Sequence, residues 1–131
     1  MHTTSHFLST LLPLFLSIDQ GDLSRWNVGK VRQMNSCFNN AKNFQGVGLS
    51  EWDVSSAKTM QSMFRECRRF NSDISKWQVG GVNDMESMFF NAHSFNAAIG
   101  GWSVGSVARM NTMFWASVQF QQVRDWWPKV A

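Results

Sequence analysis

Charged residues are scarce in this chain. Asp, Glu, Lys and Arg together make up 16% of its 131 residues, whereas hydrophobic residues make up 44%. Disordered proteins have the opposite balance, because they carry too little apolar surface to offset the entropy that is lost on ordering. The composition therefore excludes disorder, and the length suits one folded domain rather than two.

Motifs for metal binding and catalysis are also missing. The histidines His2, His6 and His93 do not lie at zinc-ligand spacing from either of the two cysteines. No set of nucleophile, base and orienting group recurs along the sequence, and it contains no glycine-rich phosphate loop of the Walker or Rossmann type. We therefore expect a protein that is not an enzyme and that uses no cofactor and no metal ion.

No hydrophobic run is long enough to span a bilayer. The apolar stretch Phe7–Leu16 covers about ten residues, roughly half of what a membrane-spanning helix needs, so we expect no transmembrane segment. A secretory signal is one interpretation of this stretch, but no Lys or Arg precedes it and no clear small-x-small cleavage site follows it. The interpretation that we favour is a degenerate terminal repeat that caps a stack.

Although it lacks these motifs, the sequence contains an internal repeat. The chain has no Tyr and 2 Pro, but it has 7 Trp, 11 Phe and 8 Met, a bias typical of one pattern copied several times. Successive tryptophans lie 26, 25, 25 and 25 residues apart, at Trp26, Trp52, Trp77, Trp102 and Trp127. A fixed period in this range predicts stacked repeats, in which each unit covers the apolar face of the next.

Other positions keep the same period and form columns of one residue type. Two columns hold Phe, one holds Met and two hold polar residues. Their members are Phe38, Phe64, Phe89 and Phe114; Phe44, Phe70, Phe95 and Phe120; Met34, Met60, Met85 and Met110; Gln45, Asn71, Asn96 and Gln121; and Ser36, Ser62, Ser87 and Thr112. We interpret the polar columns as structural, because stacked amides and hydroxyls can hydrogen-bond from one unit to the next.

The local spacing of apolar residues changes within each unit. From Ile74 to Val82 it follows the pattern of the short parallel strand of leucine-rich repeats, with Trp and Val in place of Leu. From Val82 to Ala92 the apolar residues lie three and four apart, which predicts one stripe of a helix. The small residues Gly80 and Gly81 separate the two patterns and suit a turn.

Two strings of the sequence are similar to a known repeat. One begins at Met63 and reads MFRECRRFNSDISKWQV, and the other begins at Met88 and reads MFFNAHSFN. Both resemble the BspA-like leucine-rich repeat of surface proteins, which runs roughly MFxxAxxFNxDISxWDVSxVxxM, and the similarity covers nearly all of Leu23–Trp127. The resemblance implies an α/β fold, a right-handed leucine-rich-repeat-like solenoid with a short parallel sheet on one side and short helices on the other. It also implies long arrays on secreted or surface-exposed proteins linked to adhesion.

We expect two parts along the chain. Residues 1–22 form a degenerate N-terminal repeat or cap, with a signal-like segment as the alternative. Residues 23–131 hold about four BspA-like repeats. The last repeat is truncated, because Arg124 stands where Ile or Leu is expected. We therefore expect the chain to be part of a longer repeat array.

The sulfur-containing residues fit the core columns. Cys37 shares a column with Met, and Cys67 shares one with Ala and Ser. Because a disulfide between different columns would need a special geometry, we interpret both as buried thiols that behave as small hydrophobes. Pairs such as Met85-x-x-Met88 offer the thioethers that Cu(I) favours, but they share the stripe of the core Phe residues, so we interpret them as core.

Polar residues that flank Trp and Val on the predicted strand form a candidate binding face. Side chains alternate between the two faces of a strand, so these residues should point away from the core. The face consists of Arg25, Asn27, Glu51, Asp53, Lys76, Gln78 and Ser103. Repeat proteins commonly bind ligands on such extended surfaces, and we expect a protein or glycan ligand here. The alternative is that these residues are merely solvated.

Two further features lie outside this face. Phe90 and Trp115 share one column, and exposed aromatic residues in adjacent units can mark an interface; partial burial under a neighbouring loop is the alternative. Arginines around Arg68 make a local basic patch in a chain of net charge +3, which a solvated helix end also explains. Nucleic-acid binding would need a broader basic stripe with available aromatic residues, so we expect no nucleic-acid partner.

The repeat and the missing catalytic motifs predict a non-enzymatic repeat module for protein or glycan binding. The BspA-like resemblance implies that this module is of the surface or adhesion type and is located outside the cell (extracellular) or on the cell surface. An intracellular protein-interaction scaffold and a structural spacer of a longer array are the alternatives. An enzyme would require a partner domain that the sequence does not contain.

Overall fold

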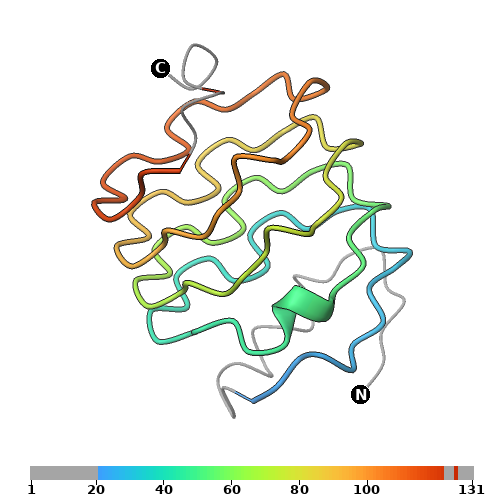
Figure 1. Ribbon diagram of the computed structural model, residues 1–131, viewed down its shortest axis with the longest axis horizontal. Helices are drawn as coiled ribbons and strands as arrows, with labels where there is room; N and C mark the ends of the chain where they lie inside the picture. The colour runs from blue at the N-terminus through green and yellow to red at the C-terminus, as the bar shows by residue number, and fades with distance from the viewer. Residues whose placement is uncertain (1–20, 123–125, 127–131) are drawn as a thin grey trace.

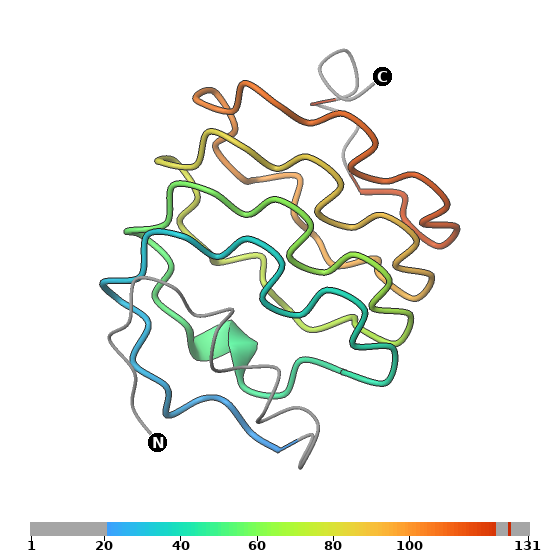
Figure 2. The ribbon, with the colours of Figure 1, turned by 180° about the vertical axis from the view of Figure 1, so that it is seen from behind.

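The chain winds into a stack of coils (Figure 1). The computed structural model describes residues 21–122 and Trp126. Within this part we number the coils by their place in the repeat: the first coil is 23–48, the second 49–73, the third 74–98 and the fourth 99–122. Seen from both sides, successive coils run parallel to one another, from blue through green and yellow to orange (Figures 1 and 2). The sequence period is therefore the period of a stack.

Regular secondary structure is almost absent from the described residues. One 3-10 helix, η2 (Leu49–Glu51), opens the second coil. Isolated parallel β-bridges join Gln33 to Thr59, Thr59 to Asp84, and Asp84 to Arg109, one for each pair of neighbouring coils. The prediction of an α/β, leucine-rich-repeat-like solenoid, with a short parallel sheet on one side and short helices on the other, is therefore wrong. The described coils consist of tight turns and short extended segments.

Residues 82–92, predicted to form a helix, are a run of tight turns. The amides of Met88 and Phe90 each donate to the carbonyl three residues earlier, at 3.2 and 3.1 Å. Ser87 and Asn91 have φ angles of 56° and 58°, in the left-handed region that a right-handed helix excludes. The two equivalent positions of the other coils also have positive φ: Ser36, Asn40, Ser62, Glu66, Thr112 and Ala116.

Between these turns, the backbone of each coil bonds to the next coil. The amides of Met85, Ser87, Phe89 and Asn91 donate to carbonyls of the fourth coil at 2.7–3.1 Å. The same four positions of the first and second coils donate in the same way. A helix would direct these amides to carbonyls four residues earlier in its own chain segment, so a helical segment could not make these bonds.

The spacing of the aromatic rings gives the physical reason for the error. The ring of Phe89 lies 5.6 Å from that of Phe64 and 5.7 Å from that of Phe114, measured between centroids, with planes within 8° of parallel. Packed helices have axes about 8–10 Å apart, so a helix in every coil would pull these rings apart. The spacing of three and four that predicted a helix arises here because successive turns return side chains to the core.

The predicted strand, residues 74–82, also consists largely of turns. The amides of Trp77 and Val82 donate to the carbonyls three residues earlier, at 3.2 and 3.0 Å. The link to the second coil comes from a side chain, since the indole Nε1 of Trp77 donates to the carbonyl of Leu49 at 2.8 Å. The β-bridge of this coil lies beyond the predicted strand, at Asp84.

The tryptophan column forms one stack inside the coils. Trp52, Trp77 and Trp102 are buried, with ring centroids 6.5 and 6.3 Å apart. Each donates its indole N–H to a carbonyl of the preceding coil at 2.8–3.0 Å. Trp126 donates its indole N–H to the carbonyl of Gly100 and stacks on Trp102 at 6.0 Å, so it continues the column, whereas Trp127, where the spacing predicted the next member, lies outside the described residues.

The terminal segments of the predicted domain division fall outside the described residues. This applies to residues 1–20, which hold most of the predicted cap or signal segment, and to Trp127 and the residues after it. The division into residues 1–22 and 23–131 therefore stays a prediction.

Both cysteines are buried and free, as the column assignment predicted. The Sγ of Cys67 donates to the carbonyl of Phe38 at 2.9 Å. Burial raises the pKa of both thiols, which keeps them protonated and unreactive. Met85 and Met88 are also fully buried, in agreement with their interpretation as core.

Removal of one ring from the interior of a stack should strongly lower the free energy of unfolding. Phe64 is fully buried and lies between Phe38, at 5.5 Å, and Phe89, at 5.6 Å. We expect Phe64→Ala to lower the free energy of unfolding by about 3–5 kcal/mol in urea denaturation. Phe120→Ala is the control, and it should cost less because Phe120 is only partly buried. Equal losses would contradict a core that depends on rings packed on both sides.

The residues with positive φ allow a test of turn against helix. A change to glycine should raise the free energy of unfolding if the segment is a turn and lower it if the segment is a helix. Ala116 has φ 58° and lies where the pattern predicted the helix of the fourth coil. Because this conformation costs an L-residue about 1–2 kcal/mol and glycine adds unfolded-state entropy, Ala116→Gly should raise the free energy of unfolding by up to about 1 kcal/mol.

A helix at this place would lose about 1 kcal/mol on the same change. The matched control is Ala92→Gly, because Ala92 is buried and has no positive φ; this variant should be destabilised. Urea denaturation of the two variants measures both values, and destabilisation of Ala116→Gly would rule out the turn assignment.

Candidate functional site

The side chains of the predicted binding face are exposed in the structure. This holds for each of Arg25, Asn27, Glu51, Asp53, Lys76, Gln78 and Ser103. They flank the buried Trp column and the Val column, of which Val28, Val54 and Val79 are buried and Val104 is partly buried, although the segment is not a strand. Whether they bind a ligand stays a prediction.

Two residues of this face also serve their own turns. The Oδ1 of Asn27 accepts the amide of Gly29 at 3.2 Å. The Oδ1 of Asp53 accepts both the amide and the hydroxyl of Ser55, at 3.0 and 2.6 Å. Asparagine and aspartate often close turns in this way, so in the first and second coils the position after Trp has a structural role and is exposed as well.

A second surface consists of Arg65, Phe90 and Trp115, which we call the aromatic ladder. The rings of Phe90 and Trp115 stack with centroids 4.7 Å apart and planes 17° apart. The guanidinium carbon of Arg65 lies 4.8 Å from the centroid of Phe90, within range of a cation–π interaction. Phe90, in the third coil, thus contacts a cation of the second coil and an indole of the fourth.

Exposure distinguishes the aromatic ladder from the core columns. The side chain of Trp115 is 59% exposed, whereas the other tryptophans of the described part are buried. The sequence analysis placed Phe90 and Trp115 in one column but missed the contact between Arg65 and Phe90. The available signal was the shared repeat position of Arg65, because neighbouring members of a column lie one coil apart.

A polar cluster lies next to the aromatic ladder in the sequence. Asn91 donates its Nδ2 to Glu66 at 2.8 Å, and the Nε2 of His93 lies 2.6 Å from the Oδ1 of Asn91. Glu66 also lies 3.7 Å from the guanidinium of Arg68. The predicted basic patch is therefore divided, with Arg65 on an aromatic ring and Arg68 beside a carboxylate. Because the side chains of His93 and Asn91 are bonded to each other, we interpret this cluster as structural.

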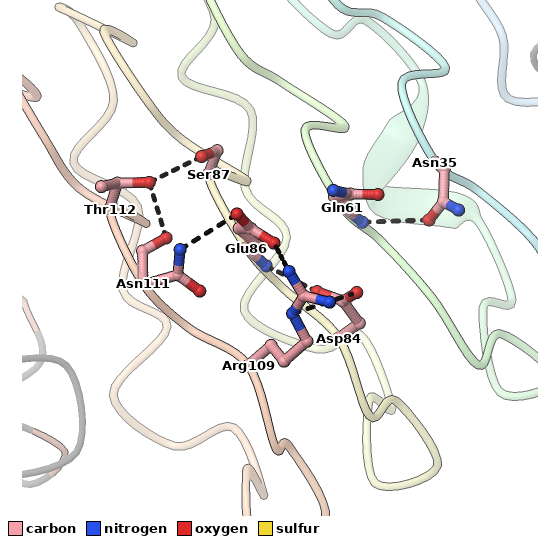
Figure 3. Close-up of polar contacts among 8 residues, drawn as sticks. All are labelled: Asn35, Gln61, Asp84, Glu86, Ser87, Arg109, Asn111 and Thr112. Atoms are coloured by element: carbon pink, nitrogen blue, oxygen red, sulfur yellow. Dashed lines mark hydrogen bonds and ion pairs between the residues drawn. The ribbon is translucent and has the colours of Figure 1, made fainter.

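A network of charged and amide side chains follows the β-bridges (Figure 3). Arg109 donates to Glu86, and its Nε lies 4.0 Å from the Oδ2 of Asp84. Asn111 donates its Nδ2 to the other oxygen of Glu86 at 3.0 Å. Both carboxylates therefore have partners from the next coil, and the arrangement joins the third coil to the fourth rather than leaving an acid free for chemistry.

The predicted polar columns make bonds between coils. The hydroxyl oxygens of Ser87 and Thr112 lie 2.6 Å apart (Figure 3). Asn71 accepts the amide of Asn96 at 2.7 Å, and Asn96 accepts the amide of Gln121 at 3.0 Å. The structural interpretation of these columns is therefore confirmed at these positions.

Metal and membrane sites are not found in the described part of the chain. Residues 21–122 and Trp126 contain no group of three or more His, Cys, Asp or Glu side chains placed to hold a metal ion. They also contain no helix with the length and apolar character needed to cross a bilayer.

Comparison with known proteins identifies the family of this chain. The model of a family described as "Mycoplasma protein of unknown function, DUF285" matches residues 9–127. The match covers most of the sequence, so the chain belongs to this family. No curated protein and no solved structure matches the chain significantly.

The turn at Asp53 should titrate in a predictable way. Hydrogen bonds from the hydroxyl and the amide of Ser55 hold the pKa of Asp53 below its ordinary value. Ser55→Ala removes the hydroxyl and keeps the amide, so we expect the pKa of Asp53 to rise toward about 3.9 in an NMR titration. Because the pKa is lowered in the folded state, the interaction stabilises the fold above the unfolded-state pKa and is lost as pH falls through the folded-state pKa.

Asp73 provides the internal control for this titration. Its pKa is lowered by the hydroxyl and amide of Ser75, which the Ser55→Ala substitution leaves intact. The pKa of Asp73 should therefore stay where it is. An equal rise at Asp73 would contradict a local cause at Asp53.

Proposed function

We propose that this member of the DUF285 family is a non-enzymatic binding module that holds its ligand against the aromatic ladder. The observation that carries the proposal is Trp115, whose indole is 59% exposed and stacked on Phe90. Single exposed apolar residues are common on protein surfaces, but Trp115 continues a ladder through Phe90 to Arg65. Burial of such a ring against a ligand is worth about 25 cal/mol for each Å² removed from water.

The chemistry of the aromatic ladder favours a protein as the ligand. Trp and Arg are enriched among the residues that carry most of the binding energy in protein interfaces, and the ladder holds both. Glu66 and Asn91 follow the ladder positions in the sequence and are already bonded to each other, so they need little ordering when a partner arrives. A glycan that stacks on Trp115 is the alternative ligand.

The BspA-like resemblance supports a place for this module on a secreted or surface-exposed protein. We propose an extracellular or cell-surface location and a role in adhesion, within a longer repeat array. An intracellular protein-interaction scaffold and a structural spacer are the alternatives. Whether the complete gene encodes an export signal separates the extracellular proposal from the scaffold.

A binding screen tests the proposed function. The purified chain is presented to an array of extracellular-matrix proteins and glycans, together with a Trp115→Ala variant. We expect saturable binding to a protein and a loss of affinity of about 30-fold in the variant, because truncation of a central interface Trp typically costs about 2 kcal/mol or more.

A second variant separates the aromatic ladder from the predicted binding face. Lys76→Glu combined with Gln78→Ala alters that face, and both residues are exposed, so binding at the ladder should be retained. Loss of binding in this variant alone would move the ligand to the predicted face. Capture of a glycan would replace the protein as ligand. Absence of binding by a well-folded chain would contradict a binding module and favour a spacer.

A further inference from the structure

A hollow of about 340 Å³ lies between the first and second coils. Lys30 and Arg32 line it from the first coil, and Ser55, Ser56 and Lys58 line it from the second. None of these residues belongs to the aromatic ladder or to the predicted binding face. The hollow is therefore a separate feature of the surface.

The hollow concentrates positive charge without a matching acid. No Asp or Glu is among its lining residues, and none of its three cations forms an ion pair within the described part of the chain. The carboxylate of Asp53, which is bonded to the lining residue Ser55, accepts two hydrogen bonds from it. Lys30, Arg32 and Lys58 thus line one hollow, and no carboxylate among its lining residues offsets their like charges.

The backbone fixes the distance between the two walls. The amide of Lys58 donates to the carbonyl of Arg32 at 2.8 Å, and the hydroxyl of Ser56 donates to the carbonyl of Gly29 at 2.6 Å. Because the walls are joined by these bonds, the cations can separate only by side-chain rotation. The Ser55 and Ser56 hydroxyl protons are already donated to Asp53 and to the carbonyl of Gly29, so an anion in the hollow would bond to the Lys and Arg side chains that line it, with Lys58 reaching it by side-chain rotation.

The repeat supplies its own comparison for this hollow. At the positions of Lys30 and Arg32, the third coil has Gly81 and Asn83, and the fourth coil has Ser106 and Ala108. A Cβ on Gly81 would lie 3.1 Å from the Nζ of Lys58, so the ammonium group of Lys58 lies beside the third coil, at a position without a side chain. The fold does not need cations at these positions, since the later coils stack without them. The cations of the first two coils are therefore not required for the backbone geometry that all four coils share.

We infer that the hollow binds a tetrahedral oxyanion, the sulfate or phosphate group of a larger ligand. Arginine forms paired hydrogen bonds to two oxygens of such a group, and lysine adds a compact charge. The volume exceeds that of one oxyanion, which has a few tens of Å³ on the scale of a water molecule's share of about 30 Å³. Space therefore remains for the carbon skeleton that carries the anion. Sulfated glycans and phospholipid headgroups both present this chemistry.

An NMR titration of the folded chain tests this inference. Inorganic sulfate and phosphate should shift the amide signals of Lys30, Arg32 and Lys58 saturably. The combined substitution Arg32→Gln and Lys58→Gln should weaken this binding at least tenfold. The matched control, Arg69→Gln with Lys42→Gln, removes the same types of charge from exposed positions and should leave it unchanged.

The ligand source is identified in two further arms. A heparin-type sulfated oligosaccharide and vesicles that contain phosphatidylinositol phosphate are titrated against the same variants, with phosphatidylcholine vesicles as the blank. Binding in either arm that depends on Arg32 and Lys58 supports the inference and assigns the source. Equal weakening by the control pair, or absence of saturable shifts in every arm, would overturn it. Trp115→Ala should leave anion binding intact, so failure at the aromatic ladder and failure at the hollow are distinguishable.

Discussion

The short distance between coils is the constraint on which the structure depends. In the two Phe columns, neighbouring rings lie 5.4–6.1 Å apart, and amides reach carbonyls of the next coil at 2.7–3.1 Å. This spacing is closer to that of paired strands, about 4.8 Å, than to that of packed helices, about 8–10 Å. Each coil must therefore be one backbone thick, and turns with left-handed residues are what fold 25 residues into so thin a layer.

The same constraint organises the surface. Residues at one repeat position lie in neighbouring coils, so a column in the sequence becomes a row of side chains in contact. Where the column keeps its type, the row is structural, as in the bonds from Asn71 to Asn96 and on to Gln121. Where the residue type of a column differs between coils, the row presents side chains of different chemistry at the surface. The aromatic ladder and the basic hollow are both such departures, and both lie outside the columns that hold the core.

The columns could be predicted from the sequence, and the local conformation could not. Burial of Phe64, Phe89 and Cys67 follows from their register alone. The helix was predicted from a spacing of three and four, but a run of turns produces the same spacing, and the φ angles at Ser87 and Asn91 together with the amide bonds to the next coil distinguish the two. The exposure of the residues on either side of Trp could be predicted, because it depends only on the alternation of buried and exposed residues along this segment. The cation–π contact of Arg65 was not, because it depends on how far a long side chain reaches toward the next coil.

The sequence by itself determined the repeat, its period and the residues that are buried, because a 25-residue pattern of Trp, Phe and Met leaves one consistent register for a stack. Tertiary structure decided what each unit looks like. Whether a chain segment forms a helix or turns depends on which carbonyls accept hydrogen bonds from its amides. Here the accepting carbonyls belong to the neighbouring coil. The same holds for Trp126, which continues the tryptophan column because its ring stacks on Trp102 and its indole N–H bonds to the carbonyl of Gly100. These contacts join coils, so no single repeat contains the information that decides them.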